Sequence, residues 1–141
     1  MPIETTTAPA MIVGDNWLAI LVAAIATYAV GAAIYGGGSK IWLGLTGYTK
    51  EQLKPHMWKM AISPILPIMS AIGLALTLKA SRVDNIATGL FYSFIVWGLL
   101  ILPARLYNFV YSPEKIGLAV MDLTHLLLGT LVAGGIISAW P

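Results

Sequence analysis

The sequence contains no cysteine among its 141 residues. This absence excludes disulfide bridges, thiolate nucleophiles, iron–sulfur clusters and zinc sites built on thiolates. Charge is also scarce, because only 10% of the residues are Asp, Glu, Lys or Arg, whereas 58% are hydrophobic. A soluble domain of this size needs more polar surface to stay dispersed. The composition therefore indicates an integral membrane protein.

Four long apolar runs fill most of the chain. Each is close to the length of about 20 residues that a helix needs to cross a bilayer. We predict an all-α fold, an integral membrane four-helix transmembrane bundle that forms a single domain over residues 16–141. The expected spans cover about residues 16–36, 62–80, 84–110 and 113–139.

The segment before the first run, residues 1–15, is expected to form a polar N-terminal lead. It contains Glu4 and Asp15 but no Lys or Arg, whereas a secretory signal peptide begins with basic residues. The first span is therefore expected to stay in the mature protein. Asp15 and Asn16 can cap its free amides.

Aromatic residues and helix breakers mark the ends of the spans. Trp17 and Tyr35 bracket the first span at the depth of the membrane interface, and Gly36–Gly38 are expected to end it. Ser63-Pro64 and Ser112-Pro113-Glu114 each offer a serine cap followed by proline in the first turn of a helix. If the second helix begins earlier, its prolines kink it instead. A kink is also expected in the third span, at Pro103.

The connection formed by residues 36–59 is expected to contain a short interfacial helix. Within Ser39–Leu45, the side chains of Ile41, Trp42 and Leu45 share one helical face, so this segment can lie in the headgroup plane. Thr49 and Gln52 have the spacing of a capping box, which predicts a second short helix.

The basic residues predict the orientation of the bundle. Six lie on the side of the long loop, namely Lys40, Lys50, Lys54, Lys59, Arg105 and Lys115, whereas the opposite side has Lys79 and Arg82. The positive-inside rule then places loop 36–59 in the cytoplasm and both termini outside. The same charges are suited to anionic lipid headgroups, and we expect no nucleic-acid partner.

Two ionisable residues, Asp122 and His125, interrupt the fourth apolar run. An ionisable group inside a bilayer is costly unless it is paired. The two residues share a helical face at positions i and i+3, and Arg105 and Asn108 close the third span on the same side of the membrane. We predict an ion pair between Asp122 and Arg105, with His125 donating to Asp122 or to a backbone carbonyl. Such a cluster can fix helix register, relay protons or ions, or contact a ligand.

Small residues recur at spacings that let helix backbones approach closely, for example in Gly129-x-x-x-Ala133. This pattern serves either internal packing or a face for another subunit. The candidate interface and anchor residues are Trp17, Tyr35, Lys40, Trp42, Gly129 and Ala133. The chain has no phosphate-binding glycine loop, no His-Glu-x-x-His and no Gly-x-Ser-x-Gly, so we expect no enzyme activity, no cofactor and no metal.

Several landmarks resemble those of a known family. They are Asn16-Trp17-Leu18, Tyr35, Lys40-x-Trp42, Thr46-Gly47, Pro103 with Asn108, and Asp122-x-x-His125. In this order the chain resembles the small bacterial membrane proteins grouped as "domain of unknown function seventeen-sixty-one", over about residues 16–140. The resemblance implies a four-helix fold in a bacterial inner membrane and brings no activity. The family pattern has Tyr-Ser-Pro after the first span, whereas this chain has Tyr35-Gly36-Gly37.

The primary hypothesis for function is an accessory or scaffold subunit of a larger membrane complex. Its partners would be membrane lipid and other membrane subunits, or further copies of the same chain. One alternative is a minimal homo-oligomeric transporter that couples protons or ions to a small solute through Asp122. A second alternative is a membrane enzyme that handles a lipid or quinone with Arg105, Asp122 and His125 at the cytoplasmic interface.

Overall fold

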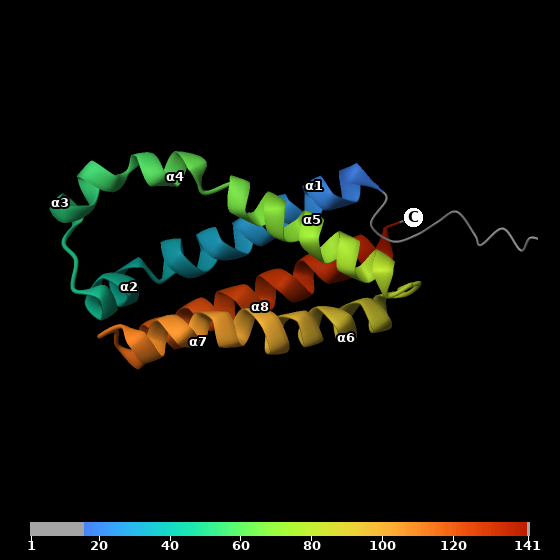
Figure 1. Cartoon of the computed structure of the whole chain (residues 1–141). Helices are drawn as coiled ribbons and strands as arrows, with labels where there is room; N and C mark the ends of the chain where they lie inside the picture. Colours follow the sequence, from blue (N-terminus) through green and yellow to red (C-terminus); the bar gives the residue numbers. More distant parts are fainter. Residues whose placement is uncertain (1–15, 141) are drawn as a thin grey trace, which may run out of the picture.

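A computed structural model describes residues 16–140, and this part of the chain is helical without any strand (Figure 1). The polar lead expected for residues 1–15 lies outside the described residues. Four stretches are long and apolar enough to cross a membrane, namely Trp17–Gly36, Trp58–Ala80, Ile86–Tyr111 and Ile116–Ala139. The structure therefore confirms the predicted four-helix transmembrane bundle.

The first span consists of α1 (Trp17–Gly31) and a π-helical segment (Ala32–Gly36). The Asn16 side chain caps α1 by accepting bonds from two backbone amides, as predicted. The first span ends at Gly36, within the predicted stop at Gly36–Gly38. The Gly38 amide bonds to the Ile34 carbonyl, and a β-carbon on Gly38 would lie 2.9 Å from the end of Met121, so this glycine allows a close passage of the chain.

The helix α2 (Ser39–Thr46) follows directly and confirms a helix in the segment expected at the interface. It ends at Gly47, whose φ of 74° is strained for residues with a side chain. Leu45 packs against Gly117 at the start of the fourth span, and Lys115 Nζ donates to the Gly44 carbonyl at 2.9 Å. The position of α2 in the headgroup plane stays a prediction.

Residues 50–62, which we call the arm, stand away from the bundle. They comprise α3 (Lys50–Leu53), a 3₁₀ turn (Lys54–His56) and α4 (Trp58–Ile62). The predicted capping box between Thr49 and Gln52 starts α3. In Figure 1 the arm bridges the gap between α2 and residues 65–80, and its α4 forms the start of the second span.

The second span begins earlier than expected and is broken at Ser63–Pro64 between α4 and α5 (Ile65–Ala80). The prediction that Ser63 caps a helix start is wrong, because its hydroxyl donates backward to the Met60 carbonyl at 2.8 Å. The proline instead bends a helix that is already under way. The helix α5 ends in a tight turn. In this turn Arg82 adopts φ 54° and the Val83 amide bonds to the Leu78 carbonyl. This is a Schellman motif with arginine in the usual place of glycine.

The third span comprises α6 (Ile86–Val96), a π-helical segment (Trp97–Ile101) and α7 (Leu102–Tyr111). Pro103 accounts for the expected irregularity, because it lacks an amide proton and its ring crowds the carbonyl four residues earlier. The fourth span, α8, covers Ile116–Ala139.

The expected cap of the fourth span at Ser112-Pro113-Glu114 is wrong. The Ser112 hydroxyl donates to the Asn108 carbonyl, and no side chain caps α8. Glu114 does not serve as a first-turn acid either, since its carboxylate binds a guanidinium on α7. That charge-assisted pair is a stronger partner than the free amides of a helix end.

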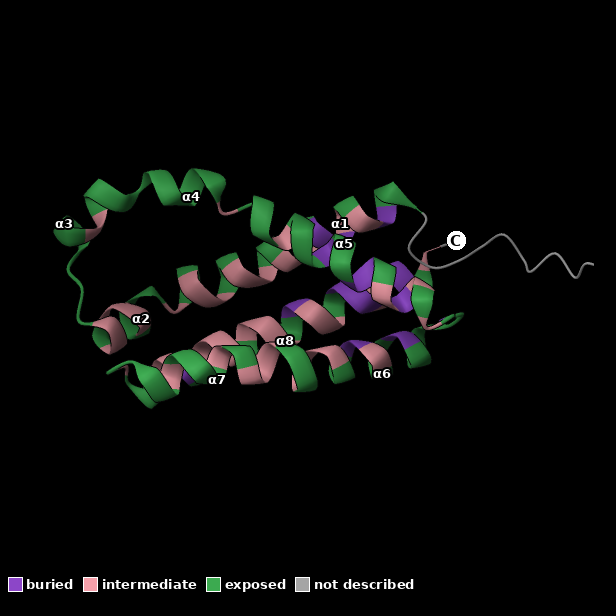
Figure 2. Ribbon diagram, in the orientation of Figure 1, coloured by how far each residue is buried: buried purple, intermediate pink, exposed green. Residues whose placement is uncertain are grey.

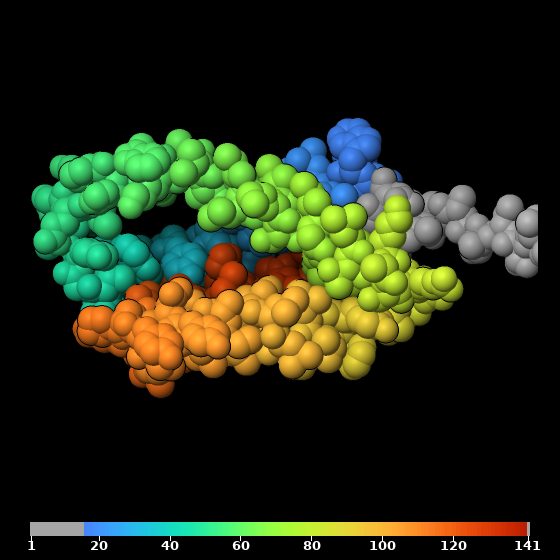
Figure 3. All heavy atoms as spheres, viewed as in Figure 1, coloured from blue at the N-terminus to red at the C-terminus, as the bar shows by residue number. Residues whose placement is uncertain are grey.

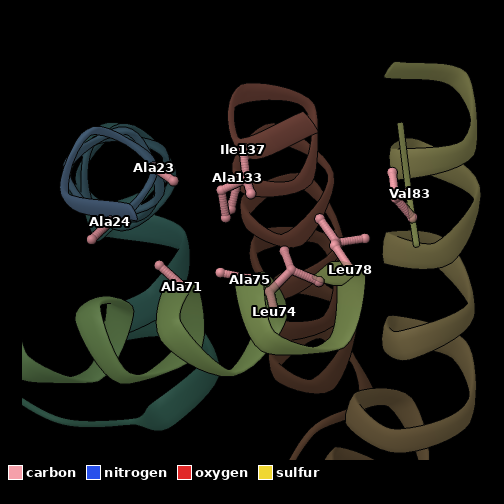
Figure 4. Packing of buried hydrophobic residues seen from close by; sticks show 9 residues of the cluster. All are labelled: Ala23, Ala24, Ala71, Leu74, Ala75, Leu78, Val83, Ala133 and Ile137. Atoms are coloured by element: carbon pink, nitrogen blue, oxygen red, sulfur yellow. The ribbon is translucent and has the colours of Figure 1, made fainter. Parts of the chain in front are cut away.

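The helix α8 lies at the centre and packs against α1, α5, α6 and α7. Most buried residues gather in the half of the bundle that contains the C-terminus and the connection after α5 (Figure 2). Figure 4 shows the main cluster, in which side chains of α1, α5 and α8 meet. Its members are Ala23, Ala24, Ala71, Leu74, Ala75, Leu78, Val83, Ala133 and Ile137.

The contact between α6 and α8 depends on two reciprocal glycine–serine pairs. A β-carbon on Gly134 would overlap Ser93, and one on Gly89 would overlap Ser138. Each buried serine hydroxyl donates to the glycine carbonyl one turn earlier in its own helix, so neither remains unsatisfied. Because Gly89 and Gly134 have no side chains, the backbones of α6 and α8 can approach closely.

Candidate functional site

Asp122 joins three helices at the end of the bundle that carries the long loop. From α7, the Arg105 guanidinium contacts Asp122 Oδ2 through Nε at 2.9 Å and Nη2 at 2.8 Å. From the end of the first span, the Tyr35 hydroxyl donates to Asp122 Oδ1. The structure thus contains the predicted ion pair and adds Tyr35, which the sequence indicated only as an aromatic anchor.

Arg105 also binds Glu114 with two parallel bonds, at 2.6 Å to Oε1 and 2.9 Å to Oε2. The side chains of Arg105 and Glu114 are only 10% and 15% exposed, and that of Asp122 is 25% exposed. The Arg105 guanidinium therefore binds two carboxylates, those of Asp122 and Glu114. No sequence pattern indicates this shared pairing, because Glu114 also fits the pattern of a helix-start acid.

His125 lies beside this cluster, but among the residues that the structure describes no hydrogen bond joins its ring to Asp122 or to a backbone carbonyl, contrary to the prediction. Its ring packs edge-on against Tyr35, with centroids 5.2 Å apart and an interplanar angle of 76°. On α1, Gly31 makes room for the ring, since a β-carbon there would lie 2.9 Å from His125 Nε2. Asn108 is exposed, and its membership of the cluster stays a prediction.

The predicted anchor and interface residues divide into exposed and buried groups. Trp17 and Lys40 are exposed, whereas Trp42 is half-buried with its ring near Tyr48. Gly129 and Ala133 are buried, and the Gly129 carbonyl accepts a bond from the Thr27 hydroxyl on α1. These two small residues therefore serve internal packing, one of the two roles left open for them.

A groove of about 990 Å³ lies beneath the arm, and in Figure 3 the hollow is visible between the arm and the body of the bundle. Asp122 and Tyr35 line it on the bundle side, and His56 and Lys59 line it from the arm. Its other lining residues are Trp42, Tyr48, Gln52, Leu53, Met57 and Met60. The groove thus brings an aromatic and apolar surface next to the Asp122 carboxylate.

Two further cavities continue from the groove toward the centre of the bundle. The middle cavity, about 580 Å³, shares Tyr35 and Met60 with the groove. The inner cavity, about 350 Å³, shares Thr27, Ser70, His125 and Leu126 with the middle one. The polar residues Thr27 and Ser70 have no distinctive sequence signal, because only the fold turns them toward the same space.

The three cavities together form what we call the vestibule, and irregular backbone lies along it. The π-helical segment that contains Tyr35 lines the groove and the middle cavity, and Leu100 and Ile101 of the other π-helical segment line the inner one. Such segments occur often at functional sites. Past the inner cavity, the main buried cluster fills the space between α1, α5 and α8.

Comparisons with known proteins point to one family. No curated protein and no solved structure matches the chain significantly. A family model described as "Protein of unknown function (DUF1761)" matches residues 18–138, which is most of the sequence and covers nearly all of the four spans and the whole Asp122 cluster. The chain therefore belongs to the DUF1761 family, as the ordered landmarks in its sequence predicted.

Proposed function

We propose that this protein is a small transporter that admits a solute from the side of the long loop and couples its movement to protonation of Asp122. The observation that carries the proposal is the vestibule, whose three cavities share lining residues from the arm to the middle of the bundle. Cavities of this size with few polar groups are typical of small-molecule sites. Two or more copies would together enclose a complete path.

Asp122 is suited to the coupling role because its ionised carboxylate binds side chains of the first and third spans. The ionised carboxylate accepts bonds from Tyr35 and Arg105, whereas a protonated carboxyl attracts the guanidinium much less. Uptake of a proton would weaken the contacts of α8 with α1 and α7 at the mouth of the vestibule. Arg105 would keep Glu114 as its partner, so its charge would stay paired.

Cysteine accessibility tests the open vestibule, because the natural chain has no cysteine to remove. In lipid nanodiscs, we expect Ser70→Cys to react readily with the neutral reagent 2-hydroxyethyl methanethiosulfonate. Ile72→Cys is the matched control on α5, since Ile72 is exposed like Ser70 but lines none of the three cavities. A thiol there faces lipid, where the reactive thiolate does not form. Equal, slow labelling at both positions would contradict the proposal.

The coupling role requires a second measurement. The labelling rate of Ser70→Cys is expected to vary with pH beyond the intrinsic reactivity of a thiol, which Met57→Cys in the groove reports. Asp122→Asn should abolish this additional dependence, because the amide cannot change its charge. If the pH profile is the same with and without Asp122→Asn, Asp122 does not control access.

The accessory-subunit hypothesis is the competing proposal. It predicts a stable partner that co-purifies in mild detergent, whereas the transporter retains its vestibule when purified alone. The hypothesis of a lipid- or quinone-handling enzyme requires a cleft between the third and fourth spans. The middle cavity instead lies mainly among residues of the first, second and fourth spans, which favours the transporter.

We further propose that the protein resides in a bacterial inner membrane with loop 36–59 in the cytoplasm. The basic residues of the arm and of α2 support this orientation. A membrane-impermeant maleimide should label Tyr48→Cys in inside-out vesicles and leave it unlabelled in intact spheroplasts. The reverse result would place the long loop outside.

A further inference from the structure

The middle and inner cavities differ from the groove in charge. Asp122 and Lys59 line the groove, whereas the described residues that line the two deeper cavities include no Asp, Glu, Lys or Arg. An ionic ligand that moved past Tyr35 would lose water without gaining a charged partner. That loss costs several kcal/mol for an isolated ion in an apolar environment. The deeper cavities therefore disfavour charged ligands.

Their polar side chains differ in how far they are already hydrogen-bonded. The hydroxyls of Thr27, Thr77 and Thr130 each donate to a helix carbonyl and are satisfied. By contrast, no hydrogen bond joins the His125 ring or the Ser70 hydroxyl to another residue in the described part of the chain, although both line the two deeper cavities. A neutral imidazole offers one donor and one acceptor.

The position of His125 also favours a ligand contact. Its ring is held between Tyr35 and Gly31, and the close approach to Gly31 limits how far it can turn. Ser70 on α5 lines the same two cavities from another helix. The available polar groups that line both deeper cavities thus come from two helices, and neighbouring lining residues such as Leu66, Pro67 and Leu126 are apolar.

We infer that His125 and Ser70 form a binding site for an uncharged, largely apolar molecule that carries one or two hydrogen-bonding oxygens. The cavity volumes of about 580 and 350 Å³ suit a molecule of one or two rings. This inference rests on the proposed function, because the ligand reaches His125 through the vestibule. It specifies the solute class, which the Asp122 cluster alone does not.

Three naphthalene probes test the inference at pH 7. They are 2-naphthol, which is neutral with one hydroxyl, 2-naphthoate, which is charged, and naphthalene, which cannot form conventional hydrogen bonds. The chain has two histidines, so ring nitrogen NMR of protein labelled with ¹⁵N-histidine in nanodiscs gives few signals. His56→Gln assigns those of His125. We expect 2-naphthol to shift the His125 signals saturably, naphthalene to bind more weakly, and 2-naphthoate to leave them unchanged.

Variants distinguish the contribution of the hydrogen bond to 2-naphthol affinity from that of packing. The affinity of each variant is measured by competition against tritiated 2-naphthol. His125→Phe keeps a ring beside Tyr35 and should weaken 2-naphthol binding by about 2- to 10-fold, the effect of one ordinary hydrogen bond. His125→Gln should retain most of the affinity. Ser70→Phe should fill the cavity and abolish binding, whereas Ile72→Phe should not, because Ile72 on α5 lines none of the three cavities.

The outcomes distinguish this inference from the proposed function. If Ser70→Cys is labelled but 2-naphthol never shifts the His125 signals, the vestibule is open and the inferred site is wrong. If 2-naphthoate shifts them as strongly as 2-naphthol, the uncharged class is wrong. If Ser70→Cys is not labelled, the proposed function itself fails.

Discussion

The Tyr35 hydroxyl donates a hydrogen bond to the Asp122 carboxylate, which lies 87 positions further along the chain. Because Tyr35 ends the first span and Asp122 lies on α8, this bond joins the two spans at the mouth of the vestibule. Arg105 approaches the other carboxylate oxygen from α7. Removal of any of these three groups is therefore expected to loosen the loop end of the bundle.

We expect Tyr35→Phe to lower the free energy of unfolding by about 1.5–3 kcal/mol, the usual range for a hydrogen bond to a charged group. The ring contact with His125 should persist, because phenylalanine keeps the aromatic face. Unfolding by sodium dodecyl sulfate in mild detergent measures the change. Tyr28→Phe on α1 is the matched control, since no described residue bonds its hydroxyl, and it should have little effect. Equal effects of the two variants would show that the bond contributes no stability.

Arg105→Gln should destabilise the protein more than Asp122→Asn does. Loss of the guanidinium leaves two partly buried carboxylates without a cation, whereas loss of the Asp122 charge leaves Arg105 paired with Glu114. Breaking a buried pair from one side costs about 3–5 kcal/mol in a fully desolvated site, and these groups retain some exposure, so we expect about 2–3 kcal/mol. Unfolding of the two single variants measures the difference.

The double variant Arg105→Gln/Asp122→Asn provides the control for this prediction. It should be more stable than Arg105→Gln alone, because it removes one of the two unpaired carboxylates. Purely additive losses would mean that Arg105 and Asp122 act independently, despite the 2.8 Å between Nη2 and Oδ2.

Gly134→Ala should destabilise the contact between α6 and α8 by about 1–3 kcal/mol, the usual cost of overpacking. The added methyl group would overlap Ser93, which is itself buried against Gly89. Gly135→Ala, at the next position, should be neutral or stabilising, because its β-carbon would make an ordinary 3.6 Å contact with Leu90. Thermal unfolding of the two variants in detergent compares them. If Gly134→Ala is tolerated as well as Gly135→Ala, the close packing of the two helices is incorrect.

Arg82→Gly should stabilise the protein by up to about 1 kcal/mol. Arg82 ends α5 with φ 54°, a conformation that glycine adopts at little cost. Arg82→Ala removes the same charge and side chain but keeps the β-carbon, so it should not stabilise. The same unfolding measurement distinguishes them, and a gain in Arg82→Ala equal to that in Arg82→Gly would assign the effect to charge.

The spans were predictable because their length and hydrophobicity follow from the bilayer itself. The ion pair between Asp122 and Arg105 was predictable for a related reason, since a charge in the membrane must find an opposite charge nearby. Predictions based on local capping were less reliable. Ser63 and Ser112 both have the sequence pattern of a helix cap, yet each hydroxyl bonds backward to a carbonyl.

Tertiary contacts account for what the sequence did not indicate. Glu114 binds Arg105 only because the turn between α7 and α8 brings them together. Gly89 and Ser93 matter only because α6 lies against Gly134 and Ser138, and no single-helix pattern shows that pairing. The vestibule likewise depends on the bend at Ser63–Pro64, which directs the preceding arm away from the bundle.

The alanines of the main buried cluster have a mechanical consequence. Alanine provides five of its nine members, namely Ala23, Ala24, Ala71, Ala75 and Ala133. Methyl groups interlock little, so neighbouring helices can tilt there without forcing large side chains into new rotamers. The opposite end is fastened by the directional bonds of Asp122, Arg105 and Tyr35. The small-residue packing at one end and the directional polar bonds at the other would suit a rocking motion of the helices in the proposed transporter.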